Sequence, residues 1–297
     1  MTTTFSIIIP TRDRHHAVAT LLESIKRLDG LARVKPEIIV CDNCSKDQTW
    51  SSLREIAADY PVPLSLLQST SPGKSRALNE AIAVARGEVL AFLDDDVVVE
   101  PAWLAAWENH FRQSSQLAAQ GAIHIPPREF ADPEIRRLIE KYRTVRPIDF
   151  DANASAIDSL NGANMAVRRE LFDRVGKFDI RLGPGASGTS EDVELARRIC
   201  RSGTKIDYVK QAVVYHHVDR SRLTEAYFRA VHKRQGASRF MFKRQSVGRI
   251  IMDLGRASAQ YGFYSLFGSE RDRYRSKGRI YHYLGMLEAK RKTRREK

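Results

Sequence analysis

The stretch Val89-Leu90-Ala91-Phe92-Leu93-Asp94-Asp95-Asp96 joins five apolar residues directly to three aspartates. An apolar run of this length predicts a strand that is buried on both faces. Adjacent carboxylates repel one another, so burying them together is costly unless a cation is present. The stretch therefore predicts a core strand that ends at a cation site. The alternative is a solvated acidic turn, or a set of helix caps ahead of Pro101.

Upstream of this stretch, short apolar runs alternate with helical patterns. Residues 5–9, 37–41 and 64–67 are predicted strands. Apolar residues at helical spacing predict helices at residues 16–28, 50–57 and 74–85 between them. Strands that are apolar on both faces and alternate with helices indicate a parallel sheet with helices on both sides.

Downstream, the pattern predicts further elements of both kinds. They are a helix at 101–111, a strand at 118–125, a short strand at 165–167, a glycine-rich loop at 183–189, a helix at 191–200 and a strand at 206–215. Residues 126–158 show no clear period. The expected fold class is α/β, with a mixed sheet flanked by helices and a basic, mainly helical C-terminal extension.

The charge of the chain is concentrated in its last quarter. The formal net charge is +13, from 49 Lys and Arg against 36 Asp and Glu. From Arg220 onward there are 21 basic and 6 acidic residues, a net of +15, which leaves −2 for the preceding 219 residues. We therefore expect a nearly neutral domain at residues 1–219 and a basic extension at 220–297.

The three cysteines, Cys41, Cys44 and Cys200, are too few and odd in number for a disulfide framework. This cysteine usage fits a reducing compartment. The N-terminus has no basic segment followed by a long apolar one, and no run of about 18 apolar residues occurs. We expect a cytoplasmic protein without a signal peptide or a membrane-spanning segment.

Polar residues follow four of the predicted strands, at residues 10–14, 42–43, 94–96 and 216–217. Ligands of open parallel sheets bind at the carboxyl ends of the strands. Because these ends belong to one edge of the sheet, we expect their side chains to converge on one site.

The three aspartates favour a hard divalent cation, Mg²⁺ or Mn²⁺, which takes oxygen ligands together with phosphate oxygens. His216 or His217 could complete the metal site through a neutral imidazole. A histidine at the end of a strand is otherwise a structural residue.

Basic side chains near the same edge are candidate partners of a diphosphate. They are Arg12, Arg14, Lys74 and Arg76, of which the last two stand at a helix start, where free N–H groups favour anions. The alternative is a solvated helix face. Asp42 could accept hydrogen bonds from a base or ribose, cap the helix that follows, or do both.

Glu191 and Asp192 lie in the first turn of a predicted helix, after the glycine-rich loop. A carboxylate at this place could act as general base on an acceptor hydroxyl. The alternative is helix capping, with Ser190 as the cap and the acidic residues interacting with the helix dipole.

Taken together, these segments resemble the family-2 glycosyltransferases of the GT-A fold, in the same order and spacing over residues 5–218. The matching pieces are Ile7-Ile8-Ile9-Pro10-Thr11-Arg12-Asp13-Arg14, Ile39-Val40-Cys41-Asp42-Asn43-Cys44-Ser45, Gly73-Lys74-Ser75-Arg76-Ala77-Leu78-Asn79, Leu93-Asp94-Asp95-Asp96, Asn161-Gly162-Ala163-Asn164, Val175-Gly176-Lys177-Phe178-Asp179 and Glu191-Asp192. The fold implied is the nucleotide-diphospho-sugar transferase fold.

The resemblance implies roles for these residues. The end of the first strand (Pro10, Thr11, Arg12, Arg14) and Asp42 would hold the base and the ribose. Residues 94–96 are similar to the DxD motif of the family, with Asp94 or Asp95 near the ribose and Asp96 on the metal.

The resemblance also assigns the second half of the site. Asp192 matches the position of the catalytic base, with Glu191 beside it. Residues 214–218 and 222–224 are similar to a subset of the family in which the first histidine is constant, so His216 is the expected metal ligand. We expect Trp103, Asn161, Gly162 and Asn164 on the acceptor side.

The activity implied is metal-dependent, inverting transfer of one sugar from a nucleoside diphosphate sugar, with UDP favoured. The acceptor would be a hydroxyl of a glycan or lipid-linked molecule in the synthesis of cell-surface polysaccharide or glycoconjugates. Processive members carry a Gln-x-x-Arg-Trp segment and transmembrane helices, neither of which occurs here. The alternatives are a nucleotidyltransferase, for which the glycine-rich phosphate loop is missing, and an inactive nucleotide-sugar-binding protein.

The extension contains an uncharged, aromatic-rich segment, residues 257–269, flanked by basic segments. Such a segment is typical of a helix that lies in an anionic membrane surface, where a lipid-linked acceptor would be found. We therefore expect a peripheral protein at the inner face of the membrane; the alternative is a basic extension packed on the domain. Nucleic acid is not an expected partner, because it would not explain the acidic cluster at the sheet edge.

Overall fold

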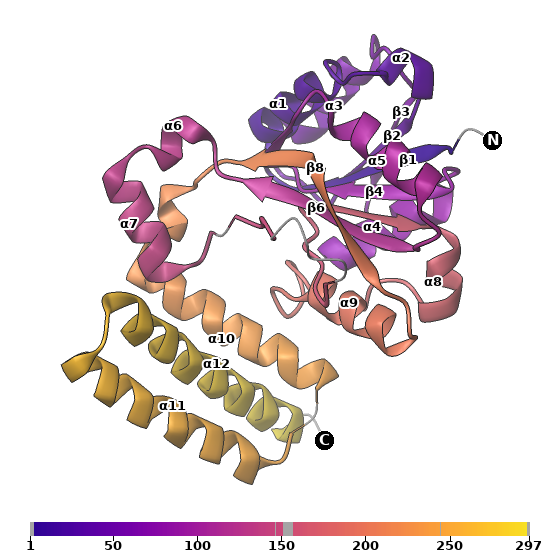
Figure 1. The fold of residues 1–297 in the computed structure, drawn as a ribbon. Coiled ribbons are helices and arrows are strands. Elements are labelled where there is room, and N and C mark those ends of the chain that lie inside the picture. Colours follow the sequence, from indigo (N-terminus) through magenta and orange to yellow (C-terminus); the bar gives the residue numbers. More distant parts are fainter. Residues whose placement is uncertain (1–2, 146, 151–156, 244, 296–297) are drawn as a thin grey trace. The chain divides into compact units, whose positions relative to one another are not determined.

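The computed structural model describes residues 3–145, 147–150, 157–243 and 245–295, with side chains to residue 292 (Figure 1). These residues form two compact units. The first comprises Met1–Ile125, Pro147–Arg181 and Glu191–His217, and the second Pro126–Arg146, Leu182–Ser190 and Val218–Lys297. The second unit thus includes two segments that lie before the single boundary expected at residue 219.

The first unit is built on an eight-stranded sheet with the order β3-β2-β1-β4-β7-β6-β8-β5. The strands β1 to β4 are parallel, β7 is antiparallel to β4 and β6, β8 is parallel to β6, and β5 is antiparallel to β8. The sheet is therefore mixed, as predicted. The bounds are β1 Phe5–Thr11, β2 Glu37–Asp42, β3 Leu64–Gln68, β4 Val89–Leu93, β5 Val97–Val99, β6 Ala118–His124, β7 Asn164–Arg168 and β8 Ile206–His216.

Strand β1 is longer than its apolar run predicts. It continues through Pro10 to Thr11, because its pairing with β2 extends to Thr11 and Asp42. Pro10 lies beyond the last pair of β1 with β4, Ile8 and Phe92, so its missing N–H costs that ladder no hydrogen bond. The extra residues carry the polar end of β1 into the site.

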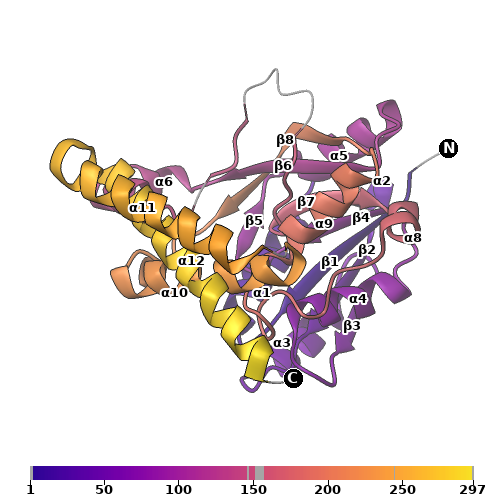
Figure 2. The same cartoon turned by 90° about the horizontal axis from the view of Figure 1, so that it is seen from below.

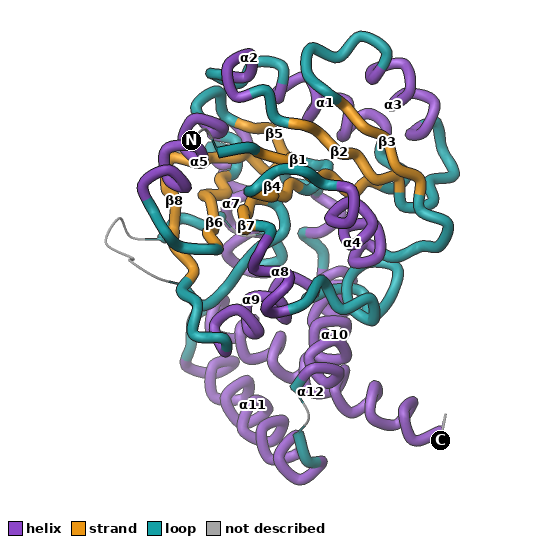
Figure 3. The backbone as a smooth tube through the Cα atoms, turned by 90° about the vertical axis from the view of Figure 1, so that its right-hand side faces the viewer, coloured by secondary structure: helices purple, strands orange, loops and turns teal. Residues whose placement is uncertain are grey.

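Helices cover both faces of this sheet (Figure 3). One face packs against α1 His15–Ile25, α3 Thr49–Ala57 and α5 Trp103–Gln113, and the other against α4 Lys74–Val84, α8 Glu170–Val175 and α9 Glu191–Arg201. Ile7 and Ile9 of β1 face the first core, and Ile8 faces the second. The unbroken apolar run of β1 follows from this burial on both faces. A short helix, α2 Leu31–Val34, follows α1.

The second unit is helical. It contains α6 Pro127–Phe130, α7 Pro133–Tyr142, a 3-10 turn at Arg220–Arg222, α10 Glu225–Phe242, α11 Val247–Phe267 and α12 Glu270–Arg295. Helix α12 lies between α10 and α11, and α11 and α12 run side by side in opposite directions (Figures 1 and 2). Glycines permit the close contact of α10 with α12, because a Cβ at Gly236 would overlap the carbonyl oxygen of His282.

Helix α7 joins this unit through an aromatic cluster. The ring of Tyr142 lies 5.8 Å from that of Phe228 on α10 and 5.4 Å from that of Tyr274 on α12. These contacts explain why residues 126–146, which show no clear sequence period, belong with the C-terminal helices. Among the described residues, no helix combines the length and apolarity needed to cross a bilayer.

A candidate active site at the sheet edge

Strands β1, β2, β4 and β8 all end at the same edge of the sheet. The convergence of polar strand ends expected from the sequence is therefore present. Thr11 Oγ1 at the end of β1 donates to Asp95 Oδ2 at 2.8 Å, and His216 Nε2 at the end of β8 lies 3.4 Å from Asp96 Oδ1.

Asp95 is the most buried of the three aspartates, with 9% of its side chain exposed. Besides Thr11, its partner is Arg14, whose Nη1 lies 3.0 Å from Asp95 Oδ1 and 2.6 Å from Asp96 Oδ2. Burial raises the pKa of Asp95 to about 6, although the charge of Arg14 opposes this. Arg14 thus holds two neighbouring carboxylates in place. Asp94, with 27% of its side chain exposed, is the more accessible candidate for contact with a ligand.

Asp96 and His216 form a candidate metal pair. His216 Nδ1 lies 2.8 Å from the carbonyl oxygen of His217, a contact that places the ring proton of a neutral imidazole on Nδ1. Its Nε2 faces Asp96 Oδ1 at 3.4 Å and would be the ligand atom for a metal. This separation fits two neighbouring ligands of one divalent cation, whose bonds are about 2.0–2.2 Å long.

The described residues contain no group of three or more His, Cys, Asp or Glu side chains arranged to hold a metal. The candidate ligands at this edge are the pair Asp96 and His216. That arrangement fits Mg²⁺ or Mn²⁺, which are commonly held by one or two protein side chains together with substrate phosphates and water.

Lys74, at the start of α4, connects two acidic parts of the site. Its Nζ lies 2.6 Å from Asp94 Oδ1 and 3.2 Å from Glu191 Oε1. Although burial lowers the pKa of Lys74, these carboxylates raise it well above its ordinary value. The structure therefore gives Lys74 carboxylate partners, where the sequence suggested a diphosphate.

Asp192 lies in the first turn of α9. Its Oδ2 accepts a hydrogen bond from the Gly162 amide at 3.1 Å, and its Oδ1 accepts from the Val193 amide at 2.7 Å. Burial, and then the charge of Glu191, raise the pKa of Asp192 to about 6. Such a carboxylate is mostly ionised at neutral pH, yet more basic than an ordinary aspartate. Ser190 has a φ of 75°, in the left-handed region, whereas a helix-capping serine is normally extended.

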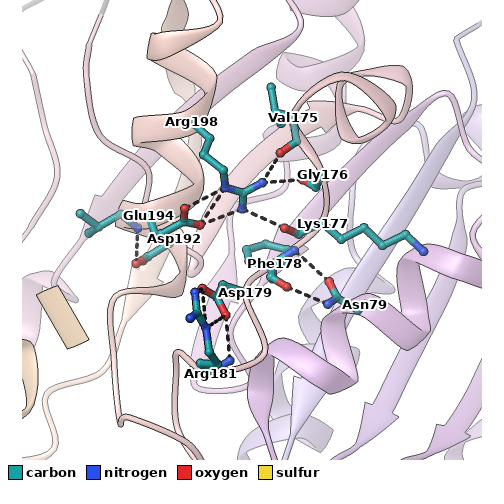
Figure 4. Close-up of polar contacts among 11 residues, drawn as sticks. Asn79, Val175, Gly176, Lys177, Phe178, Asp179, Arg181, Asp192, Glu194 and Arg198 are labelled. Carbon is teal, nitrogen blue, oxygen red and sulfur yellow. Dashed lines mark hydrogen bonds and ion pairs between the residues drawn. The ribbon is translucent and has the colours of Figure 1, made fainter. Parts of the chain in front are cut away.

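The helix that bears Asp192 is anchored by Arg198 (Figure 4). The guanidinium of Arg198 contacts Glu194 at 2.8–2.9 Å and donates to the carbonyl oxygens of residues 175–177. The segment after α8 is in turn fixed to α4, where Asn79 and the backbone of Phe178 exchange two hydrogen bonds of 2.9 and 3.0 Å. These contacts set the position of Asp192 relative to α4.

Of the four residues expected on the acceptor side, two lie at the site and two are buried in the core. Gly162 lies in the site, since a Cβ there would be 3.4 Å from Lys74 Nζ, and Asn161 is partly exposed beside it. Trp103 and Asn164 are fully buried, and Trp103 Nε1 donates to Asn164 Oδ1 at 2.8 Å. Asn164 Nδ2 donates to carbonyls of β6 and β8. This pair ties α5 to the sheet, and neither side chain has surface for an acceptor.

Asp42 is also fully buried. Its carboxylate accepts from the Ser45 amide at 3.1 Å and from Gln68 Nε2 at 3.3 Å. Asp42 is not the cap of α3, whose N-cap position is Gln48; the Thr49 amide in the first turn of α3 donates to Asp47 at 2.9 Å. Asp42 therefore holds the turn after β2 in shape.

The sequence predicts Asn43 at this edge, next to Asp42, but gives it no role of its own. Asn43 is buried, and its Oδ1 accepts from the Gly73 amide at 2.7 Å, which links the end of β2 to the start of α4. The sequence feature that points to Asn43 is its position directly after a core strand.

The two remaining predicted arginines differ in their surroundings. Arg12 is partly exposed, with its Nε 3.4 Å from Asp13 Oδ2. Arg76 Nε is buried and has no hydrogen-bond partner in the described part of the chain. It can therefore donate to an anionic ligand, because a buried donor without a partner is otherwise costly.

The family model described as Glycosyl transferase family 2 matches residues 6–176. Glycosyltransferase AglE of Haloferax volcanii is 24% identical over 211 residues, 71% of this chain and 66% of AglE. O-antigen biosynthesis protein RfbC of Myxococcus xanthus is 28% identical over 236 residues, 74% of this chain and 18% of RfbC. The matches thus cover slightly less than two thirds of AglE and less than a fifth of RfbC.

Solved structures share the fold. The mannosyltransferase PcManGT of Pyrobaculum calidifontis, in complex with GDP-Man and Mn²⁺, superposes with a TM-score of 0.62 at 21% identity, covering 96% of this chain and 86% of that one. Residues 1–349 of TarS from Staphylococcus aureus, in complex with UDP-GlcNAc, give a TM-score of 0.53 at 17% identity, covering 97% and 92%.

Proposed function

The chain belongs to glycosyl transferase family 2, and on this premise we propose that it moves one sugar from a nucleoside diphosphate sugar to a hydroxyl group. The acceptor class is a glycan or lipid-linked molecule in the synthesis of cell-surface polysaccharide or glycoconjugates. UDP-sugars are the favoured donors and GDP-sugars the next, since a UDP-GlcNAc complex and a GDP-Man complex occur among proteins of this fold.

One observation supports this proposal above the others. The ion pairs of Lys74 connect Asp94, beside the Asp96 and His216 pair, to Glu191, beside Asp192. A candidate cation pair and a carboxylate with raised pKa therefore belong to one site, as transfer from a diphosphate to a hydroxyl requires.

On the donor side, Asp96 and His216 would hold Mn²⁺ or Mg²⁺. The cation would supply charge neutralisation to the diphosphate as it leaves. Arg14 keeps Asp96 oriented through its 2.6 Å contact, and Arg76 Nε is available to donate to a phosphate oxygen. The end of β1, with Pro10, Thr11 and Arg12, would lie against the nucleoside, with Asp94 near the ribose.

On the acceptor side, Asp192 takes the proton of the attacking hydroxyl. The hydroxyl oxygen bonds to the anomeric carbon while the bond from that carbon to the diphosphate oxygen breaks. Attack opposite to the leaving group inverts the configuration. A carboxylate with a pKa of about 6 suits this task, because it is both ionised and basic near neutral pH.

We also propose that the C-terminal extension places the enzyme at the inner face of an anionic membrane. The end of α11 exposes three large apolar side chains, Phe263, Leu266 and Phe267, at 58%, 77% and 76%. Ile251 and Met252 are exposed on the same helix, and the extension has a net charge of +15. An apolar surface in a cationic segment fits insertion among anionic headgroups.

Vesicle binding tests this placement. Full-length protein should sediment with phosphatidylglycerol vesicles at physiological salt and should not bind duplex DNA there. A Leu266→Asp and Phe267→Asp double variant should lose vesicle binding, while Val193→Asp, which also replaces an exposed apolar residue, should retain it. Equal binding of vesicles by the two variants would contradict the proposal.

A donor screen tests the central activity. UDP-, GDP- and dTDP-sugars should be measured for binding and hydrolysis, each with and without Mn²⁺ or Mg²⁺. We expect one donor to bind and hydrolyse in a metal-dependent manner. If the folded protein binds none of them in the presence of metal, the proposed function is wrong.

A further inference from the structure

A pocket of about 290 Å³ lies within the second unit, between α7, α10 and α12. Its volume lies just below the range for small-molecule sites, about 300–1,000 Å³. None of its residues belongs to the sheet-edge site, whose residues all lie in the first unit.

The pocket is strongly cationic. Its lining includes Lys141, Arg143, Arg275 and Arg279, and no lining residue in the described structure is an aspartate or glutamate. Lys141 is paired with a carboxylate outside the lining, because its Nζ lies 3.2 Å from Glu270 Oε1.

Two of the arginines have no acidic partner among the residues whose side chains are described. Within the described residues, no carboxylate lies within 4.0 Å of Arg275 or Arg279, and Arg279 Nη1 donates instead to Gln260 Oε1 at 3.1 Å. Burial, together with Arg271 and Arg275, lowers the pKa of Arg143. Like charges are therefore crowded at this pocket, which an anion would relieve.

The floor of the pocket is built from packed rings. Phe228 is 1% exposed, and its ring lies 5.4 Å from that of Tyr274 and 4.3 Å from that of His232. His232 Nδ1 is 2.8 Å from the Phe228 carbonyl oxygen, which fixes the imidazole in place. The aromatic floor is thus fixed, while Arg275 and Arg279 are exposed side chains that line the pocket.

The positive charge of the pocket comes from the arginines and the lysine. Burial, together with Arg239 and His232, lowers the pKa of His282 to about 4, so this histidine is neutral at physiological pH. Guanidinium groups remain charged at every relevant pH and bind phosphate oxygens in a bidentate manner.

We propose that this pocket binds a phosphate group, supplied either by a free phosphate or by the headgroup of a lipid. Arg275 and Arg279 would provide the direct contacts, with Arg143 adding to the field. The site is additional to the donor site, and the proposal does not depend on glycosyl transfer.

The test is phosphate binding by the full-length chain, by titration calorimetry without divalent cation and at constant ionic strength adjusted with chloride. The wild type should bind inorganic phosphate. The Arg275→Gln and Arg279→Gln double variant should weaken that binding about tenfold or more, because two charge-assisted contacts are lost. Arg291→Gln, which removes an exposed cation of α12 outside the pocket, should bind as the wild type does.

Two results would overturn the proposal: no phosphate binding above the chloride baseline, or equal losses in the double variant and in Arg291→Gln. Circular dichroism checks the folding of each variant, and Arg279→Gln alone serves if the double variant unfolds. Retained donor binding by the double variant would separate this site from the sheet edge.

The source of the phosphate is distinguished by a second titration. Dioctanoyl phosphatidic acid, below its micellar concentration, should bind more tightly than inorganic phosphate if the natural ligand is a lipid headgroup. Equal affinities would indicate free phosphate. Both titrations should show the same loss in the double variant.

Discussion

Lys74 Nζ lies 2.6 Å from Asp94 Oδ1, so a lysine at the start of α4 is paired with the first carboxylate after β4. The same Nζ lies 3.2 Å from Glu191 Oε1, and its charge also lowers the pKa of Asp192. A single buried cation therefore influences both the acidic strand end and the proposed base. Its removal should be visible in the pH dependence of the reaction.

The value of kcat/KM should rise with pH through about 6 and then level off. Asp192 must be ionised to accept a proton, and its pKa in the free protein is about 6. Asp192→Asn should lower kcat about 10²–10⁴-fold, the usual contribution of a general base, while donor affinity stays unchanged. Wild-type turnover in Asp192→Asn would refute the assignment.

Lys74→Met and Glu191→Gln should shift this pH profile in opposite directions. Loss of the lysine charge raises the pKa of Asp192 and moves the acid limb to higher pH. Loss of the Glu191 charge lowers that pKa and moves the limb to lower pH, because Glu191 is the main charged group that raises it. Lys210→Met, at an exposed position of β8, is the control that should leave the profile in place. Shifts of the same sign would contradict this account.

Asp96→Asn and His216→Ala should both weaken the metal-dependent part of donor binding. We expect the metal-dependent affinity for the donor to fall roughly 10–100-fold or more. Replacing even a residue that only hydrogen-bonds to a metal ligand has an effect of this size. Calorimetric titrations of donor with and without Mn²⁺ would measure this, with His16→Ala on the exposed side of α1 as the control. If the Mn²⁺ dependence survives in both variants, the cation is held elsewhere.

The buried Asp95 should make the protein less stable as pH rises from about 4 to about 6. Its pKa is near 3.9 in an unfolded chain and about 6 in the folded one, so in this window the folded state binds more protons. The contribution is at most about 3 kcal/mol, from roughly two pKa units. Asp95→Asn lacks this titration. Its free energy of unfolding, measured by urea titration, should therefore increase relative to that of the wild type as pH rises from about 4 to about 6. A difference that does not change with pH would show that Asp95 does not titrate there.

Much of the sheet could be predicted from the sequence, because strands buried on both faces leave unbroken apolar runs such as residues 5–9 and 89–93. Parallel strands also share one edge, so polar residues after these runs converge by topology alone. β5 Val97–Val99 was not predicted, since three residues give no period. The packing of α7 against α10 was also not predicted, because it depends on the contact between Tyr142 and Phe228, which are far apart in the sequence.

Site residues were harder to assign where a motif allows a side chain to point either inward or outward. Asp42 follows a core strand, as a ligand-binding residue would, yet its carboxylate is buried and satisfied by Ser45 and Gln68. Trp103 stands at a helix start near the aspartates, and only the three-dimensional packing shows its indole bound to Asn164. Burial and hydrogen bonding depend on non-local contacts, which a motif does not encode.

Trp103 and Trp107 offer a matched test of this structural role. Both lie on α5, both are fully buried, and their rings are in edge contact with centroids 6.3 Å apart. Trp103 Nε1 donates to Asn164, whereas Trp107 Nε1 has no hydrogen-bond partner among the described residues.

Replacing either tryptophan by phenylalanine removes a similar apolar volume, but only Trp103→Phe leaves the buried Asn164 Oδ1 without its donor. Such an unsatisfied group costs about 1–3 kcal/mol. The free energy of unfolding should therefore fall by about 1–3 kcal/mol more in Trp103→Phe than in Trp107→Phe, as measured by urea titration. Because the indole of Trp103 has no exposed surface, acceptor KM should be the same in the two variants once both are folded. If the two variants are equally stable and only Trp103→Phe has a raised acceptor KM, the structural role is wrong and Trp103 contributes to acceptor binding.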